Sequence, residues 1–174
     1  MTTNVKTVRL EFDKKEDGIE LTDITRQVEH SVIDTHVIDG IVTISVSSPE
    51  LSITTMEYEP GTIKDMKDAM EKLAPMANGG ANDGGNKRYA YGLGGLGTAV
   101  SYRDHSRIRH DEDGSVEEKK SDVMHAILGP SITIPVKDNR IMVGIWQKVV
   151  LMNFKKERGR EKVTLQVIGE FERG

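Results

Sequence analysis

The segment Gly40-Ile41-Val42-Thr43-Ile44-Ser45-Val46-Ser47-Ser48 decides the fold class of this chain. It is rich in β-branched residues, which fit a pleated strand better than a helix. The pair Asp39-Gly40 before it is typical of a turn, and Pro49-Glu50 after it interrupts the strand. Leu51 to Tyr58 is strand-like again. We therefore expect two strands, at 40–48 and 51–58, separated by a short break.

The remaining predicted strands lie on both sides of this pair. Residues 7–12 and 163–171 alternate apolar and polar side chains, as expected for strands with one buried face. Residues 130–136 are β-like but contain two prolines, which favours a strand at a sheet edge. Residues 141–154 hold enough apolar residues for two strands, and Val163 to Phe171 forms the final one.

Three segments have helical character. The first follows an N-cap at Thr22-Asp23 and places apolar residues on one face, namely Ile24, Val28, Val32 and Ile33. A second helix is expected from a cap at Thr62 to about Leu73, and a short third one from Asp122 to Leu128. Groups of strands with helices between them predict an α+β fold.

The chain has 174 residues, the size of one domain. Only 36% of the residues are hydrophobic and 30% are charged, so the material for a core is modest. Two stretches carry much of the polar surplus, the glycine-rich residues 77–97 and the charged residues 103–121. We therefore expect a single domain over residues 1–174, with a glycine-rich insertion and a charged loop beside its core.

Composition also argues against several classes of protein. No apolar run approaches the roughly 20 residues of a membrane span, and the N-terminus lacks the basic start and apolar stretch of a secretory signal. The absence of Cys rules out disulfides and thiolate metal sites and favours the cytoplasm. A net charge of -4 argues against nucleic acid as a partner. We expect neither a nucleic-acid nor a membrane partner.

Three features of the sequence bear on chemistry. Gly92 to Gly97 formally satisfies the GxGxxG pattern, but no βαβ unit surrounds it, which favours a flexible loop. Trp146-Gln147 fits either a core tryptophan or a surface that stacks on a heteroaromatic ring and hydrogen-bonds its edge. Imidazoles and carboxylates are mixed in one later part of the chain, but their spacing matches no tight metal signature. They are Asp104, His105, His110, Asp111, Glu112, Asp113, Asp122 and His125.

An ordered series of motifs resembles the YjbQ-like family, whose members are often described as secondary thiamine-phosphate synthases. The more specific motifs are those around Gly129-Pro130 and Trp146-Gln147. The matching segments are Asp23-Ile24-Thr25, Asp39 to Val42, Leu51 to Pro60, Leu128 to Val136, Val143 to Gln147 and Val167 to Glu170. The resemblance implies α+β subunits with two sheets in a sandwich-like arrangement and two to three helices, forming a homotrimer through sheets around a threefold axis.

For some members the resemblance also implies an activity, the joining of a pyrimidine pyrophosphate to a thiazole phosphate at a cleft near subunit boundaries. Pyrophosphate leaves in that reaction, so a cation must lie near the phosphates and a binding surface near the ring. The implied ligand is a small phosphorylated heteroaromatic molecule and the implied cofactor a divalent metal, Mg²⁺ or Zn²⁺. The implied catalytic residues are Glu57, His105, His110 and Asp122, and the implied substrate-binding residues are Thr54, Tyr102, Trp146 and Gln147.

The chain departs from the family pattern at the imidazoles. A family histidine falls on Ser48, followed by Pro49 and Glu50 in place of two threonines, and a second falls on Asp122. A third corresponds to His105 or His110, and these two, with Asp122, are the implied metal ligands. Serine is a poor ligand for zinc, whereas a carboxylate can still hold a hard cation. The alternative function is a non-catalytic trimeric binding or scaffold protein that kept the fold and lost the metal site.

Overall fold

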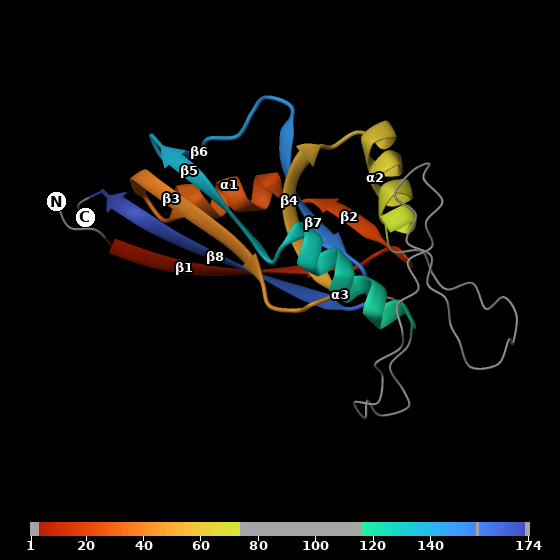
Figure 1. Cartoon of the computed structure of the whole chain (residues 1–174). Coiled ribbons are helices and arrows are strands. Elements are labelled where there is room, and N and C mark those ends of the chain that lie inside the picture. The colour runs from red at the N-terminus through yellow and green to blue at the C-terminus, as the bar shows by residue number, and fades with distance from the viewer. Residues whose placement is uncertain (1–3, 74–115, 156, 173–174) are drawn as a thin grey trace, which may run out of the picture.

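Two antiparallel β-sheets and three helices make up the described part of the chain, residues 4–73, 116–155 and 157–172 of a computed structural model (Figure 1). The α+β fold predicted from the sequence is confirmed. The strands are β1 (Asn4–Asp13), β2 (Glu20–Asp23), β3 (Val37–Val46), β4 (Leu51–Glu57), β5 (Ser131–Lys137), β6 (Arg140–Ile141), β7 (Gln147–Asn153) and β8 (Arg160–Phe171). The helices are α1 (Thr25–Asp34), α2 (Pro60–Leu73) and α3 (Val116–Leu128).

The larger sheet has the strand order β1-β8-β3-β5-β6. Its strands alternate buried and more exposed residues, as the period of two requires. On the inner face, Ile44 lies opposite Leu165, and both are fully buried. Strand β5 is bordered beyond β3 only by the two-residue β6, so the prolines of 130–136 do lie close to a sheet edge.

The smaller sheet, β2-β7-β4, is buried on both faces. Val149 and Leu151 of β7 belong to the hydrophobic cluster shared with the larger sheet and α1, whereas Val150 and Met152 belong to a second, methionine-rich cluster. The helices α2 and α3 supply Met70 and Met124 to that second cluster. The result is a three-layer arrangement in which the small sheet lies between the large sheet and two helices (Figure 1).

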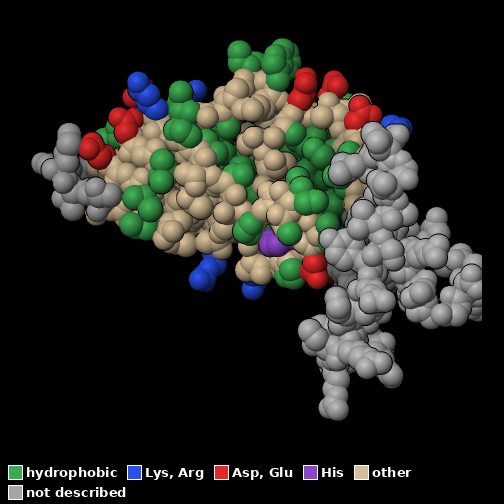
Figure 2. Space-filling view, viewed as in Figure 1, with side chains coloured by type: hydrophobic (Ala, Val, Ile, Leu, Met, Phe, Trp, Pro, Cys, Tyr) green, Lys and Arg blue, Asp and Glu red, His purple; other side chains and the backbone are tan. Residues whose placement is uncertain are grey.

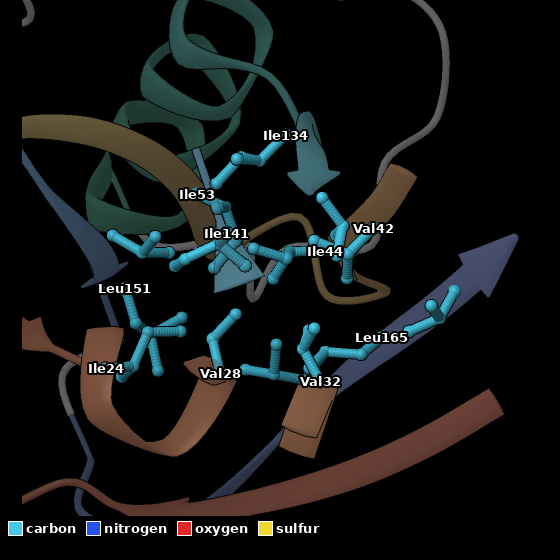
Figure 3. Close-up of a cluster of buried hydrophobic side chains, with 14 of the residues drawn as sticks. Ile24, Val28, Val32, Val42, Ile44, Ile53, Ile134, Ile141, Leu151 and Leu165 are labelled. Atoms are coloured by element: carbon cyan, nitrogen blue, oxygen red, sulfur yellow. The ribbon is translucent and has the colours of Figure 1, made fainter. Parts of the chain in front are cut away.

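Helix α1 packs its apolar face into the cluster between the two sheets. Ile24, Val28 and Val32 are fully buried and point toward the sheet residues drawn in Figure 3. The cap predicted at Thr22-Asp23 lies one residue too early, because Ile24 is the N-cap residue and makes no side-chain cap hydrogen bond. Asp23 lies just before it, and its Oδ1 accepts hydrogen bonds from the Thr25 amide (2.9 Å) and hydroxyl (2.6 Å). The prediction for Ile33 was wrong, because its side chain is 44% exposed.

Several predicted boundaries were wrong. Helix α2 begins at Pro60 rather than after a cap at Thr62, and Pro60 stands in its first turn, where proline costs no hydrogen bond. Helix α3 begins at Val116 rather than Asp122, so the end of the charged stretch 103–121 is helical. Asp39-Gly40 is no turn, since both residues lie inside β3 and pair with β8. The glycine-rich residues 77–97 and the charged residues 103–115 lie outside the described residues.

None of the described helices is both long and apolar enough to cross a membrane.

Candidate functional site

Glu57 and Gln147 lie opposite each other in the small sheet. Glu57 is the last residue of β4, Gln147 is the first of β7, and both are exposed. The Gln147 backbone amide donates to the Gly144 carbonyl (2.9 Å), and the Gly144 amide donates to Oε1 of Gln147 (3.2 Å). The carboxamide of Gln147 therefore holds the turn that carries Trp146, next to the carboxylate-bearing end of β4.

The turn before β7 projects apolar side chains into solvent. Ile145 is 87% exposed, Trp146 74% and Met142 55%. Figure 2 shows hydrophobic side chains at the top of the molecule, where Figure 1 draws the connection between β6 and β7. The interpretation of Trp146 as a core residue in a strand was wrong, because the strand begins one residue later. An exposed ring beside a carboxylate is free to stack on a ligand or on another subunit.

Ser48 lies three residues before the opposite end of β4, which begins at Leu51. Its Oγ accepts a hydrogen bond from the Glu50 amide (3.3 Å), and its carbonyl accepts one from the Leu51 amide (3.2 Å). Strand β4 then runs from Leu51 to Glu57, a length of about 20 Å at roughly 3.3 Å per residue. Ser48 and Glu57, which the resemblance places in one site, thus lie just before β4 and at its far end in a single chain.

Asp122 is exposed on α3, which packs beside β4. The helix stops before Gly129, whose φ is 85°, a backbone conformation that glycine adopts at little energetic cost. The Gly129 amide donates a hydrogen bond to the His125 carbonyl (2.8 Å). Pro130 then leads into β5, and its carbonyl accepts from the Val46 amide (2.9 Å). The Leu-Gly-Pro motif is therefore a helix stop joined to a strand entry, and it fixes α3 near the beginning of β4 (Figure 1).

In the sequence analysis His125 appears only as a member of the mixed group of imidazoles and carboxylates. It lies three residues after Asp122 on α3, is half-buried, and its Nδ1 is 2.5 Å from the Leu51 carbonyl oxygen. A carbonyl oxygen only accepts, so Nδ1 carries a proton in this contact. The signal available in the sequence was the Asp-x-x-His spacing, which places two side chains on one helical face.

Thr54 lies in the middle of β4, opposite Val150, and is half-buried. Its neighbour on the same face, Ser52, is fully buried, and the Ser52 hydroxyl has no hydrogen-bond partner among the described residues.

Tyr58 follows Glu57, and its hydroxyl donates a hydrogen bond to the Leu21 carbonyl (2.8 Å). Burial raises the pKa of the Tyr58 phenol above its ordinary value. The hydrogen bond from Tyr58 to Leu21 ties the end of β4 to β2.

The implied metal ligands do not assemble within the described residues of one chain. No group of three or more His, Cys, Asp or Glu side chains there has the arrangement needed to hold an ion. His105, His110 and Tyr102 lie outside those residues. Glu57 and Asp122, which are described, belong to separate places, the arrowhead of β4 and the helix beside its beginning (Figure 1). The set Glu57 plus Asp122 therefore does not fit a metal within one chain.

A surface pocket of about 320 Å³ is lined by none of the expected residues. Its cation, Lys6, donates to the Thr35 carbonyl (2.6 Å) and lies 4.9 Å from the centre of the Phe171 ring. That ammonium group is already engaged within the chain. The pocket residues are Lys6, Thr7, Val8, Ser31, Asp34 and Thr35.

The outer face of the large sheet is covered by no other described element. An apolar row crosses it from β1 to β5, because Val5 lies opposite Ile168, Ile168 opposite Ile41, and Ile41 opposite Pro135. Val5 is 55% and Ile41 39% exposed. The next row, also uncharged, is Thr7, Gln166, Thr43 and Thr133. An exposed apolar row beside an uncharged row is a surface suited to association.

Comparison with known proteins gives matches over almost the whole chain. A family model described as "UPF0047 protein YjbQ-like" matches residues 8–91 and 95–170. A UPF0047 protein of Archaeoglobus fulgidus is 26% identical over 145 residues, which cover 83% of this chain and 89% of that relative. A UPF0047 protein of Mycobacterium tuberculosis is 23% identical over 130 residues, or 75% of this chain and 76% of the relative.

Solved structures share the fold. A YbjQ-like protein of unknown function from Sulfolobus solfataricus superposes with a TM-score of 0.73 at 20% identity, covering 97% of this chain and 100% of the other. A hypothetical protein from Aeropyrum pernix gives a TM-score of 0.65 at 19% identity, covering 98% of this chain and 100% of the other. At this level of identity the likeness establishes the arrangement of sheets and helices.

Proposed function

The chain belongs to the UPF0047 protein YjbQ-like family, and from this premise we propose that it acts as a homotrimeric transferase of the secondary thiamine-phosphate synthase type. Its substrates would be a pyrimidine pyrophosphate and a thiazole phosphate. The observation that carries the proposal is the Glu57–Gln147 pair, with an exposed Trp146 directly beside it. This arrangement offers a ring-stacking surface next to a negative charge.

The proposed reaction makes specific demands on these residues. The bond between the pyrimidine methylene carbon and the pyrophosphate oxygen breaks, and pyrophosphate leaves with the electron pair. The thiazole nitrogen then supplies the pair for the new carbon–nitrogen bond. Positive charge develops on the pyrimidine during this exchange, so the Glu57 carboxylate would stabilise it and the Trp146 ring would hold the heterocycle. Thr54 and Tyr102 are proposed to complete the substrate contacts.

The site is proposed to be shared between subunits. In one chain Trp146 stands 74% exposed, and Glu57 lies at the far end of β4 from the helix that bears Asp122. A homotrimer formed through the outer face of the large sheet would cover the apolar row of Val5, Ile168, Ile41 and Pro135. As a separate part of the proposal, Glu57 of one subunit lies close to Asp122 of the next at a subunit boundary. His105 and His110 are proposed to lie at the same boundary.

A second candidate is a trimeric binding or scaffold protein without catalysis. It is favoured by Ser48 and Asp122, which stand where the resemblance expects histidines. The Oε1 of Gln147 is also engaged by the Gly144 amide, which limits its use for a ligand. This candidate shares the assembly with the first and differs only in chemistry.

Incubation of the purified protein with both phosphorylated substrates and Mg²⁺ or Zn²⁺ separates the two candidates. The transferase proposal expects thiamine phosphate to form, and at least tenfold more slowly with Glu57→Ala. Product formation unchanged by Glu57→Ala would remove Glu57 from the site. Saturable binding of a pyrimidine phosphate without any product would favour the binding protein.

A further inference from the structure

We propose that two copies of this chain pair edge to edge through strand β1, antiparallel, about a twofold axis that passes between their two Leu10 residues. The contact uses the backbone edge from Thr7 to Asp13. It leaves the apolar row on the outer face of the large sheet free. It is therefore a different contact from the threefold one proposed above, and it depends on no catalytic activity.

The first argument is the regularity of this sheet edge. Strand β1 is an end strand of the larger sheet, with β8 as its neighbour (Figure 1). It pairs with β8 over ten residues without a shift of register, and it contains no proline. The other sheet ends are less suitable, because β6 has two residues, β2 has four, and His125 of α3 contacts the beginning of β4. A long, straight edge that neither a proline nor a bulge interrupts is a template for another strand.

The second argument is the direction of the backbone groups. The amide of Lys14, directly after β1, donates to the Gly159 carbonyl (2.9 Å), so the polar groups of Lys14 face β8. Both polar groups of a strand residue point to the same edge, and successive residues alternate between the two edges. The odd-numbered residues therefore face the free edge, and hydrogen-bonded pairs across the twofold axis join odd to odd. These residues are Thr7, Arg9, Glu11 and Asp13.

The third argument is that charge selects one register. When Leu10 lies opposite Leu10, Arg9 of each copy lies opposite Glu11 of the other, and this pair occurs twice. The next register on either side that keeps the same hydrogen-bonding pattern places Arg9 opposite Arg9 or Glu11 opposite Glu11. Opposite charges on facing strands stabilise the pair, and like charges destabilise it. The sequence of β1 is thus complementary to itself in the register centred on Leu10.

Both charged side chains are available for this pairing. Arg9 is exposed and forms no ion pair with the described residues. The carboxylate of Glu11 is 50% exposed and contacts Nη1 of Arg160 through Oε2 only (3.3 Å). Its other oxygen can therefore accept a hydrogen bond from the Arg9 guanidinium of the second copy.

The inner face of the same edge offers apolar contact. Val8, Leu10 and Phe12 are half-buried there and pack against the main hydrophobic cluster. In the proposed register Val8 of each copy lies opposite Phe12 of the other, with the two Leu10 side chains between these pairs. The pocket of about 320 Å³ lies beside Val8, between β1 and α1, and gives the incoming ring space.

The contact is small, because a single pair of strands buries less surface than a standard interface. We expect it to be sparsely formed at micromolar concentration and substantially formed at about 0.1 mM. The threefold assembly expected at micromolar concentration is therefore unaffected.

The test introduces one thiol into the full chain, which contains no cysteine. On the twofold axis the two Leu10 residues form a non-hydrogen-bonded pair with Cα atoms about 4.5 Å apart. A disulfide spans roughly 4.4–6.8 Å between Cα atoms. Leu10→Cys, oxidised at about 0.1 mM, should therefore give a species of two chains on a non-reducing denaturing gel.

Val8→Cys is the matched control. Val8 is also half-buried on the inner face of β1, but in the proposed register it lies opposite Phe12 rather than another Val8. We expect at least about fivefold more of the two-chain species from Leu10→Cys than from Val8→Cys.

The charged pair supplies a second readout. Adding Arg9→Glu to the Leu10→Cys chain should lower the yield at least about fivefold, because it places two carboxylates opposite each other twice. Adding Glu11→Arg as well should restore most of the yield, because the exchanged charges are complementary again. Far-UV circular dichroism confirms that each variant is folded.

Several outcomes would overturn the proposal. A yield from Leu10→Cys no higher than that from Val8→Cys would exclude the pairing and leave the edge to a strand of a different protein. A yield unchanged by Arg9→Glu, or one that stays low in the folded charge-exchanged chain, would exclude the register. Neither readout uses the substrates or the threefold contact, so failure of this pairing and failure of the proposed function are distinguished.

Discussion

Gly40 of β3 and Gly169 of β8 lie opposite each other with their backbones in close approach. A Cβ atom on Gly40 would come within 2.1 Å of the Ile168 carbonyl oxygen, and one on Gly169 within 2.2 Å of the Asp39 carbonyl oxygen. Both obstacles are backbone atoms, which cannot rotate away. We expect Gly40→Ala and Gly169→Ala each to lower the free energy of unfolding by about 1–3 kcal/mol or more, measured by urea unfolding.

Gly61, in the first turn of α2, is the control for this pair. A Cβ there would meet only a flexible Glu59 side-chain oxygen at 3.4 Å. Alanine also favours a helix by up to about 1 kcal/mol over glycine. Gly61→Ala should therefore leave stability unchanged or raise it, and a loss equal to that of Gly40→Ala would show that close approach is not the cause.

The buried hydroxyl of Ser52 predicts a stabilising substitution. It is fully buried without a partner among the described residues, so it carries a desolvation penalty that no hydrogen bond offsets. Ser52→Ala should raise the free energy of unfolding by about 1 kcal/mol. Far-UV circular dichroism is the suitable signal, since Trp146 is already exposed in the folded chain.

Thr25 provides the contrasting case. Its buried hydroxyl donates to Asp23 (2.6 Å) and accepts from the Val149 amide (2.8 Å), joining α1 to β7. Thr25→Val should cost about 1–3 kcal/mol, because the Val149 amide would be left unpaired. Should Ser52→Ala prove as costly as Thr25→Val, the Ser52 hydroxyl must have a partner in solution.

Tyr58 predicts a loss of stability in alkali. Burial raises the pKa of its phenol in the folded chain, so the folded state holds the proton more tightly than the unfolded state does. The stabilisation is complete below the unfolded pKa, near 10, and is lost as pH rises through the higher folded value. Wild type should lose more stability than Tyr58→Phe between pH 8 and pH 11 in urea titrations.

At pH 8 the variant should be about 0.5–1.5 kcal/mol less stable than the wild type, because it loses the hydrogen bond to the Leu21 carbonyl. Parallel pH curves for the two proteins would contradict this account.

The apolar row on the large sheet predicts the mode of assembly. We expect sedimentation equilibrium at micromolar concentration to give three times the chain mass of 19.3 kDa. Ile41→Asp should shift the protein toward single chains, because it places a charge in the centre of the row. Ile33→Asp is the control, since Ile33 is similarly exposed, at 44%, but lies on α1. A single-chain mass for the wild type would contradict the proposed assembly.

The sequence predicted most of the strands because alternation and β-branching are local properties, but it missed the short strand β2. The strand at 163–171 and the buried face of Ile24, Val28 and Val32 were confirmed. Gly40 misled the turn prediction, since a glycine needed for close approach between strands has the same local appearance as one in a turn. The start of α2 was predicted two residues too late, because a threonine such as Thr62 suits an N-cap while proline is also accepted in the first helical turn.

The candidate site was less predictable, for a geometric reason. The order of the motifs does not show that Ser48 lies just before β4 and Glu57 at its far end. It also cannot tell that Trp146 lies in an exposed turn or that His125 is oriented by the Leu51 carbonyl. These are relations between segments far apart in the chain, set by how α3 and the small sheet pack.

The central claim is that one site draws Glu57 and Asp122 from different subunits, and it is tested by mixing two inactive variants. Glu57→Ala and Asp122→Ala chains are unfolded, combined in equal amounts and refolded, and thiamine phosphate formation is measured against each variant alone. A shared site predicts recovery of about a quarter of the wild-type rate, because random assembly places an intact Glu57 beside an intact Asp122 at one boundary in four. A mixture as inactive as the separate variants would contradict the claim.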